Sequence, residues 1–417
     1  MNISNKPAPS ACSNNKLIEA LLDRVWPLRA ARTWAPGLRT GLALLIVGSL
    51  SACASIAPPA PAPVTAAPAL ALPPSDEAAL PGVLQRPASR WVPVRWADLP
   101  GWGQDQLAPA WNAWVRGCER PAPGHALLCA ELRQLALASE AERHAWIERR
   151  FAPFRVTAPD GSEARGLLTG YYEPIMQASR LRSASHQVPL FAAPAGLRAA
   201  PTWFSREEID TLAAAQNALA GREIAWMQDP IEALILQIQG SGRIQITEPD
   251  GSVRLVRLAF AGHNGHPYRS VGRWLLDQRA IRQASWADIK SWAAQHPQRL
   301  QEMLWSNPRM VFFREEPLSD FDAQFGPRGA QGVPLTPGRS IAVDPRSIPF
   351  GTPVWLATQG PTLNLQQLVL AQDTGGAIVG AVRADYFTGW GSWSDPAFTL
   401  AAALKQPLQL WVLWPRP

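Results

Sequence analysis

From residue 336 onward, short apolar segments alternate with Gly and Pro, and the apolar spacing typical of helices is almost absent. Short strands separated by turn residues at regular intervals favour a small closed β-barrel. The sequence therefore predicts a strand-rich C-terminal region. Its expected strands are "RSIAVD" (339–344), "TPVWLAT" (352–358), "LQQLVLAQ" (365–372) and "LQLWVLW" (408–414).

The chain has 417 residues, which suits two domains better than one. Upstream of the strand-rich region, helix and strand patterns are mixed. A helical stretch over 129–151 leads into a strand over 164–176, which is expected to end in an aromatic, acidic turn. A second helix should begin at the capping box formed by Ser205 and Glu208 and end at Gly221.

Between residues 231 and 260 the pattern favours strands, among them "ALILQIQG" (233–240). A Pro-Asp-Gly turn at 249–251 separates the later strands. Two short helices are expected to follow, one capped by Ser285 and one over 298–304.

The first 52 residues have the order of a bacterial export signal, with arginines before the apolar run "GLALLIVGSL" (41–50). Ten such residues are too few to span a bilayer and suit a signal-peptide core. The following "LSAC" (50–53) resembles the lipobox of bacterial lipoproteins, in which cleavage leaves Cys53 as an acylated N-terminus. Ala54, in place of Asp, favours the outer membrane by resemblance to enterobacterial sorting rules.

The formal net charge of +6 comes mostly from this N-terminal segment, which carries six Lys/Arg and two Asp/Glu. The rest of the chain has a net charge of only +2, so composition gives little support to nucleic-acid binding. Residues 54–74 are rich in Pro and Ala and carry no charge, which predicts an extended tether. The folded part is expected to start near residue 88.

Two cysteines remain for the folded part if Cys12 is removed with the signal peptide and Cys53 is lipidated. In an oxidising compartment Cys118 and Cys129 are candidates for a disulfide, which would stabilise the fold by about 2 to 3 kcal/mol. Two reduced, buried thiols are the alternative.

Three aspartates follow apolar strands or Gly-rich turns in the strand-rich region: Asp344 in "AVDPRSIPFGT", Asp373 in "AQDTGG" and Asp385 in "RADYFTGWG". Strand ends present polar side chains at the mouth of a barrel. Three carboxylates converging there would repel one another, so at least one should have a raised pKa and stay protonated near neutral pH. A general acid requires this property. A turn-capping role is the alternative for each aspartate.

The three aspartate motifs together resemble the 3D domain of the membrane-bound lytic murein transglycosylase A family. The resemblance covers most of residues 165–395. Its upstream part rests on "TGYYEP" (169–174), "LQIQGSGRI" (236–244), "GHNGHPYRSVGRWL" (262–275) and "NPRMVFF" (307–313).

The resemblance implies a mainly β protein in which a double-psi β-barrel domain carries an inserted second β domain, with few short helices and a substrate groove between the two. It implies a lytic transglycosylase that cleaves the MurNAc-β-1,4-GlcNAc bond of peptidoglycan without water or cofactor and leaves a 1,6-anhydromuramic end. The expected segments are a signal peptide (1–52), a lipidated Cys and tether (53–87), two barrel segments (88–178 and 316–417) and the insert (179–315).

Position in the family motif assigns the acid/base role to Asp385. Asp373 is expected nearby, where it would keep the pKa of Asp385 high or stabilise positive charge at the sugar C1. Asp344 is expected to orient the loop. One carboxyl group suffices when the C6 hydroxyl of the sugar is the nucleophile, whereas glycoside hydrolases commonly need two.

The remaining motif residues are expected to line the groove and bind sugar. A polar hairpin face and aromatic core packing are the alternatives. His263 and His266 have H-x-x-H spacing, but no Cys or carboxylate nearby completes a ligand set, so no metal is expected. The expected substrate-binding residues are Tyr171, Tyr172, Glu173, Gln237, Gln239, Gly240, Ser241, His263 and Asn264.

Two other functions remain open from sequence. The Asp373-Thr374-Gly375 motif matches that of aspartic proteases, but these need two such loops and the chain has one. A non-catalytic peptidoglycan-binding lipoprotein is the second. The expected partners are glycan strands, the outer membrane through the lipid anchor, and enzymes of cell-wall synthesis or degradation, with no nucleic acid. The expected state is a monomer at the periplasmic face of the outer membrane.

Overall fold

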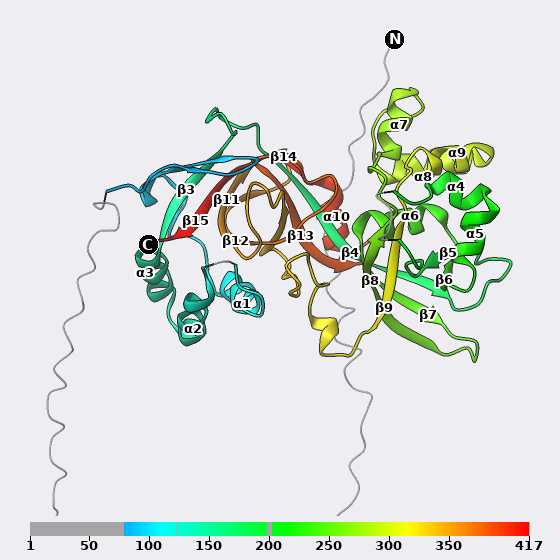
Figure 1. The fold of residues 1–417 in the computed structure, drawn as a ribbon, viewed down its shortest axis with the longest axis horizontal. Coiled ribbons are helices and arrows are strands. Elements are labelled where there is room, and N and C mark those ends of the chain that lie inside the picture. The colour runs from blue at the N-terminus through cyan, green and yellow to red at the C-terminus, as the bar shows by residue number, and fades with distance from the viewer. Residues whose placement is uncertain (1–78, 123, 198–201, 417) are drawn as a thin grey trace, which may run out of the picture. The chain divides into compact units, whose positions relative to one another are not determined.

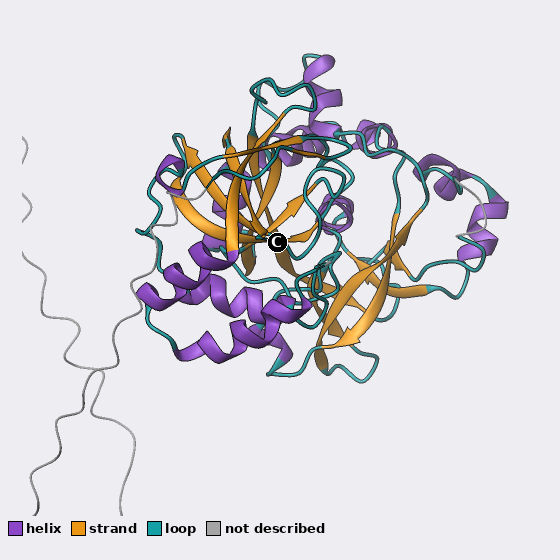
Figure 2. Cartoon of the chain, turned by 60° about the vertical axis from the view of Figure 1, so that its left-hand side comes forward, coloured by secondary structure: helices purple, strands orange, loops and turns teal. Residues whose placement is uncertain are grey.

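The structure, a computed structural model, describes residues 79–122, 124–197 and 202–416. The predicted signal peptide, the lipidated Cys53 and most of the tether lie outside these residues. Strands dominate the described part, and its helices are short, with 6 to 11 residues each (Figure 2). None of these helices is both long and apolar enough to cross a membrane.

Ten strands form the barrel and its extension, and they come from both ends of the described chain (Figure 1). They are β1 (Leu84–Gln85), β2 (Arg90–Pro93), β3 (Phe151–Thr157), β4 (Leu167–Ser179), β10 (Ser340–Val343), β11 (Pro353–Gln359), β12 (Asn364–Asp373), β13 (Arg383–Gly391), β14 (Lys405–Pro407) and β15 (Gln409–Pro415).

The strand order is β1-β2-β3-β15-β11-β12-β10-β13-β4, with β14 paired to β4. The β14 strand, paired with β4 at one end of the row, leads directly into β15 within the row, so this connection links β4 back to the strands that begin at β15. Two pairs, β10 with β12 and β4 with β13, are parallel. All four strands predicted after residue 336 are confirmed as β10, β11, β12 and β15.

The inserted segment forms a second sheet around the distal half of β4. Its strands are β5 (Val188–Phe191), β6 (Glu223–Met227), β7 (Gly242–Thr247), β8 (Val253–His263) and β9 (Val311–Pro317). Residues 175–179 of β4 pair with β7, whereas residues 167–174 pair with β13. The predicted boundary at 178/179 thus falls inside one continuous strand, and β1 lies ahead of the expected start at 88.

Short helices surround both sheets. They are α1 (Ala108–Gly117), α2 (Ala126–Gln134), α3 (Glu140–Arg150), α4 (Arg206–Thr211), α5 (Ala213–Leu219), α6 (Pro230–Gln239), α7 (Val271–Asp277), α8 (Trp286–Gln295), α9 (Leu300–Trp305) and α10 (Pro396–Ala403), with 3-10 turns at 96–98, 135–137, 297–299 and 322–324. Helix α10, which the sequence analysis missed, packs on β4 and β13.

Capping residues explain several of these boundaries. Ser205 accepts a hydrogen bond from the Glu208 N–H as predicted, but the helix breaks at Leu212 into α4 and α5. Ser285 caps α8 as predicted. The expected helix over 129–151 is likewise divided, because Ser139 and Glu142 form a capping box that starts α3.

The strand predicted over 233–240 is wrong, because these residues form most of α6. Asp229 caps the helix by accepting from the Ile231 N–H, and Pro230 occupies the first turn, where its missing N–H costs nothing. Gly240, with φ of +81°, ends the helix in the left-handed conformation. The alternation of Gln and Ile resembled a strand, but the flanking residues specify a helix.

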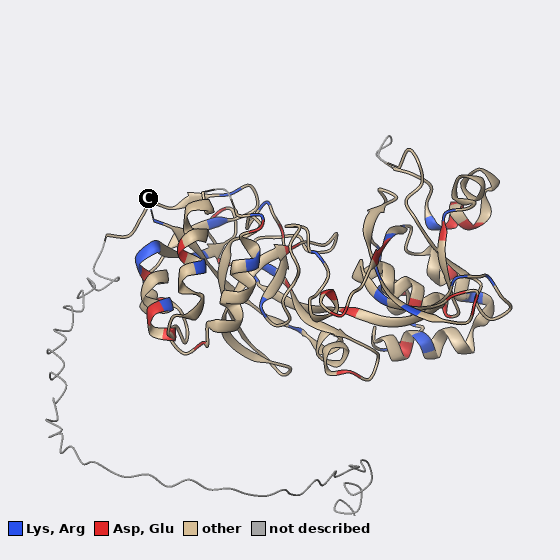
Figure 3. Cartoon of the chain, turned by 90° about the horizontal axis from the view of Figure 1, so that it is seen from below, with Lys and Arg blue, Asp and Glu red and all other residues tan. Residues whose placement is uncertain are grey.

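Tryptophan contributes mainly to the core of the barrel region. Trp111, Trp114 and Trp146 form mutual edge contacts, with ring centroids 5.4 to 5.8 Å apart, beneath helices α1 and α3. The Cys118–Cys129 disulfide ties the end of α1 to α2 beside this cluster. Basic and acidic residues are interspersed along the described chain rather than gathered by sign (Figure 3).

A buried ion cluster holds β4 to the inserted sheet. Glu173, fully buried, accepts from Arg243 Nε at 2.8 Å and from Arg257 Nε at 2.6 Å. Both guanidinium groups also donate to the Phe325 carbonyl, and Arg243 stacks on the Trp390 ring. The strand predicted over 164–176 was expected to end in an aromatic, acidic turn, but β4 continues through Glu173 to Ser179.

Replacing Glu173 by Gln is expected to lower the free energy of unfolding by about 3 to 5 kcal/mol, because two buried guanidinium groups lose the one carboxylate that pairs with them among the described residues. Urea denaturation measures the change. Glu163→Gln is the matched control, since the Glu163 side chain is 75% exposed and its pair with Arg155 should contribute less than about 1 kcal/mol. Equal losses in the two variants would contradict the structural role of the cluster.

Candidate active site

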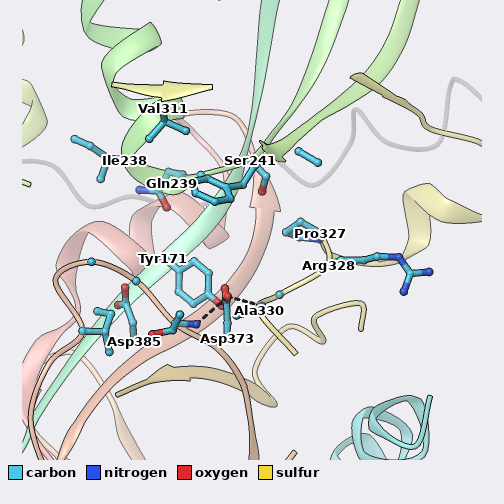
Figure 4. Close-up of a pocket in the computed structure, with 18 of the residues that line it drawn as sticks. Tyr171, Ile238, Gln239, Ser241, Val311, Pro327, Arg328, Ala330, Asp373 and Asp385 are labelled. Carbon is cyan, nitrogen blue, oxygen red and sulfur yellow. Dashed lines mark hydrogen bonds between the residues drawn. The ribbon is translucent and has the colours of Figure 1, made fainter. Parts of the chain in front are cut away.

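A cleft of about 1260 Å³ is lined by residues of β4, β13, the end of β12 and the end of α6. Residues from both sheets line it. Asp373 and Asp385 lie on its barrel wall, with the Tyr171 ring close to both, and Gln239 and Ser241 face them from the inserted segment (Figure 4).

Asp373 ends β12 and is surrounded by hydrogen-bond donors. Its Oδ2 accepts from the Tyr171 hydroxyl at 2.9 Å, and its Oδ1 accepts from the backbone N–H groups of Ala330 and Thr374, both at 2.9 Å. Three donors aimed at one carboxyl group favour its ionised form. Both oxygens of Asp373 are therefore occupied by groups that donate.

Asp385 lies on β13 directly opposite Thr169 of β4, because the parallel register pairs these two residues. The Thr169 hydroxyl donates to Asp385 Oδ1 at 2.5 Å. Arg383 in turn donates from Nη2 to the Thr169 oxygen at 2.8 Å. Among the described residues, Oδ2 of Asp385 has no hydrogen-bond partner.

Burial raises the pKa of Asp385 to about 6. The Thr169 hydrogen bond and the Arg383 charge oppose this shift, and the nearby Asp373 carboxylate adds to it. Burial also raises the pKa of Asp373, against the lowering effect of its three donors. The two acids thus lie close enough to influence each other, and Asp385 can hold a proton near pH 6.

Asp344 does not join the other two acids, so the expected convergence of three carboxylates is wrong. Its oxygens accept from Arg346, at 2.8 Å for the Nη2 donor, and from the Gly380 N–H at 3.0 Å. The Arg346 hydrogen bond lowers the pKa of Asp344. Asp344 lies outside the cleft lining and fastens the loop that connects β12 to β13.

Most of the residues expected to bind sugar do line the cleft. Within α6 the carboxamide oxygens of Gln237 and Gln239 are both occupied, the first by Arg206 at 2.6 Å and the second by the Tyr172 N–H at 3.1 Å. Their amide NH₂ groups are therefore left as donors. The lining set comprises Tyr171, Tyr172, Gln237, Gln239, Gly240, Ser241 and His263.

Glu173 and Asn264 are absent from the cleft lining, which corrects two predicted contacts. Glu173 is enclosed in the ion cluster with Arg243 and Arg257. Asn264 is 1% exposed and bonds the backbone of Pro308 and Met310. The polar atoms of both side chains are used for contacts inside the fold and not for a ligand in the cleft.

His263 and His266 are each engaged separately. His263 Nδ1 accepts from the Gly265 N–H at 2.9 Å, and His266 Nε2 lies 2.8 Å from the Trp203 carbonyl. No group of three His, Cys, Asp or Glu side chains in the described part of the chain is arranged to hold a metal ion.

Three residues of the site were missed from sequence: Thr169, Arg383 and Arg309. Thr169 reaches Asp385 only through the parallel pairing of β4 with β13, across more than 200 residues, whereas Arg383 lies two residues before Asp385 on β13 and bonds Thr169. Arg309 lies in the cleft at the start of the "NPRMVFF" region and belonged to a quoted motif. Its position there was not a sufficient signal of its role.

Comparison with known proteins gives two family matches. Residues 167–314 match the MltA specific insert domain, and residues 339–414 match the 3D domain. Membrane-bound lytic murein transglycosylase A of Escherichia coli K12 is 35% identical over 224 residues, which are 51% of this chain and 56% of that protein. The matched region thus spans little more than half the length of this relative.

Solved structures extend the likeness over most of the chain. The lytic transglycosylase LtgG of Burkholderia pseudomallei is 43% identical, with a TM-score of 0.52, and the match covers 82% of this chain and 99% of that one. MltA from Neisseria gonorrhoeae is 29% identical, with a TM-score of 0.65 and coverages of 82% and 98%.

The fold and the aspartate-bearing cleft define a 3D-domain protein with an inserted β domain, and the predicted mainly β architecture is confirmed. Within that class, the chain belongs to the membrane-bound lytic murein transglycosylase A family.

Asp385→Asn is expected to raise the free energy of unfolding at pH 8 by roughly 1 to 3 kcal/mol. The native pKa of about 6 lies above the ordinary 3.8, so the wild type loses stability as pH rises through this interval. Well below pH 3.8 the wild-type carboxyl is protonated in both states, and the gain should disappear. Urea denaturation at about pH 3 and pH 8 measures both values. A variant that is less stable than wild type at pH 8 would contradict the assigned burial.

Proposed function

We propose that the chain is a lytic transglycosylase that cleaves the MurNAc-β-1,4-GlcNAc bond of peptidoglycan and forms a 1,6-anhydromuramic end, with Asp385 as its acid and base. Family membership supports the activity, since the relatives are named lytic transglycosylases. The observation that carries the assignment of the acid is the free Oδ2 of Asp385 in the cleft.

The hydrogen-bond order around Asp385 supports Oδ2 as the protonated atom. Thr169 accepts from Arg383, so its own hydroxyl hydrogen is directed at Asp385 Oδ1. Oδ1 faces a donor, and the proton of the neutral carboxyl group therefore belongs on Oδ2. Asp373 lacks such a free atom, because donors occupy both of its oxygens.

In the first step Asp385 would donate its Oδ2 proton to the glycosidic O4, and positive charge would develop at C1 of the muramic ring. The nearby Asp373, held by Tyr171 and two backbone N–H groups, is suited to stabilise this charge as a carboxylate. Its charge also raises the pKa of Asp385, which keeps the acid protonated before the reaction.

In the second step the Asp385 carboxylate would remove the proton of the C6 hydroxyl while that oxygen attacks C1. Internal attack spares the entropy of capturing a second molecule, an advantage on the order of several kcal/mol. The same carboxyl group gives and then takes one proton, so it returns to its starting state.

The inserted wall of the cleft would hold the glycan. The NH₂ groups of Gln237 and Gln239 are suited to the carbonyl oxygens of N-acetyl groups, and Tyr172 lies beside them. Sequence alone supports the location: a lipidated Cys53 would anchor the protein at the periplasmic face of the outer membrane, with cell-wall enzymes as further partners.

Asp385→Asn is expected to lower the rate of anhydromuramic product formation from purified sacculi by about a hundred- to ten-thousandfold, because it removes the transferable proton. Mass spectrometry of the released muropeptides measures the product. Asp160→Asn, at a fully exposed turn residue, is the control and should keep the wild-type rate. Retained turnover in Asp385→Asn would overturn the assignment. No anhydro product from the wild type would favour a binding protein, and pepstatin-sensitive proteolysis would favour a protease.

The acid role also predicts the pH dependence. The rate should fall as pH rises above about 6, because Asp385 loses its proton there. Thr169→Val removes a hydrogen bond that lowers the pKa of Asp385, so the alkaline limb of the pH–rate profile should move to higher pH. A limb that moves to lower pH, or does not move, would contradict this arrangement.

A further inference from the structure

The segment that carries Arg309 is fixed by hydrogen bonds on both sides. Asn264 donates from Nδ2 to the Pro308 carbonyl at 2.8 Å and accepts from the Met310 N–H at 3.0 Å. Arg206, which is buried, donates to the carbonyls of Asn307 and Arg309 at 3.1 and 2.6 Å. The backbone of Arg309 is therefore held at the cleft wall before any ligand arrives.

The Arg309 side chain enters the cleft half-buried and largely unpaired. Its Nε donates to the His266 carbonyl at 2.8 Å, but among the described residues neither Nη atom has a partner. Two other cleft arginines differ, since Arg314 pairs with Glu316 and Arg328 lies 3.5 Å from Glu119. The guanidinium also lies near His263 and, after burial, contributes to lowering the pKa of that imidazole.

A second donor, Gln237, lines the same cleft. The same Nη2 of Arg206 that bonds the Arg309 carbonyl also donates to Gln237 Oε1 at 2.6 Å. This contact occupies the oxygen of Gln237 and leaves its NH₂ group as a donor on a side chain that is 6% exposed. Arg206 thus positions two donors on one wall of the cleft.

The glycine-rich loop after Asp373 leaves room for the guanidinium. A Cβ atom at Gly376 would lie 2.3 Å from Arg309 Nη1 and 3.1 Å from Cζ. The guanidinium therefore occupies the space that a side chain at this position would take, and a larger residue there would displace it.

We propose that the Arg309 guanidinium, together with the Gln237 NH₂ group, forms a subsite that binds a carboxylate of the glycan substrate. A half-buried guanidinium with no counterion in the described part of the chain matches a planar carboxylate through paired N–H donors. This contact is worth more than one to a neutral sugar hydroxyl. The inference rests on the proposed function, because the carboxylate belongs to a muramic substituent. It makes Arg309 a specificity-determining residue.

A peptidoglycan strand can present a carboxylate in two ways. Strands stripped of peptides by an amidase carry a free lactyl carboxylate on each muramic residue. Strands that keep their peptides have an amide at that position and carry carboxylates on the peptide instead. Chitohexaose, a neutral polymer of N-acetylglucosamine, has no carboxylate and reports only on the rest of the cleft.

The test compares wild type with Arg309→Gln on these three probes, by kcat/KM for product formation from both kinds of strand and by Kd for all three. In Arg309→Gln we expect kcat/KM and affinity to fall tenfold or more for stripped strands, for peptide-bearing strands or for both. The Kd of chitohexaose should stay within twofold of the wild-type value. Loss on stripped strands alone identifies the lactyl carboxylate. Loss on peptide-bearing strands alone identifies the peptide.

Gly376→Ala should produce the same selective loss, because it displaces the guanidinium while keeping the charge. Arg269→Gln is the control: it removes the same charge from an exposed residue outside the cleft lining and should change nothing. The Arg309 charge contributes to lowering the pKa of His263, so a carboxylate bound to Arg309 should raise that pKa. An NMR titration that shows the rise with carboxylate-bearing strands, and not with chitohexaose, would give independent support.

Equal loss of affinity for all three probes in Arg309→Gln, or no loss for any, would overturn the carboxylate subsite. If wild type forms no anhydro product from either strand, the proposed function fails. The three Kd values would still decide the subsite in that case, so the two failures can be told apart.

Discussion

The parallel pairing of β4 with β13 is the constraint on which the candidate site depends. Every second side chain of β4 points to the same side of the strand. On that side Thr169 bonds Asp385, Tyr171 bonds Asp373, and Glu173 closes the buried ion cluster. A slip of one residue would send all three side chains to the opposite face. The same register therefore positions the partners of both acids and, through Glu173, holds the inserted sheet to β4.

Two acids with different surroundings perform different tasks in the proposed reaction. Donors enclose Asp373, whereas within the described residues Asp385 has one donor and one free oxygen. Burial acts on both, yet only Asp385 combines a pKa of about 6 with an open atom in the cleft. The division of roles thus comes from hydrogen-bond geometry as much as from charge. Arg383 and Thr169 matter because they orient the proton of the acid.

Local signals predicted much of the fold. The strands β10, β11, β12 and β15 and the caps at Ser205 and Ser285 were legible from turn residues and short-range spacing. The wrong strand at α6 followed from weighing the Gln-Ile alternation above the Asp-Pro start and the Gly240 end. Long-range partners were not predictable: Glu173 finds its arginines 70 and 84 residues away. Asp344 was different, since its partner Arg346 lay two residues along the chain.

Strand β4 continues without interruption from the barrel wall of the cleft into the inserted sheet. Widening of the cleft at this point must therefore bend a paired strand, because no loop is available there to act as a pivot. Backbone hydrogen bonds on both sides of β4 resist such bending, and the ion cluster at Glu173 adds to the resistance. The separation of the two walls of the cleft is thus set largely by the stiffness of one paired strand.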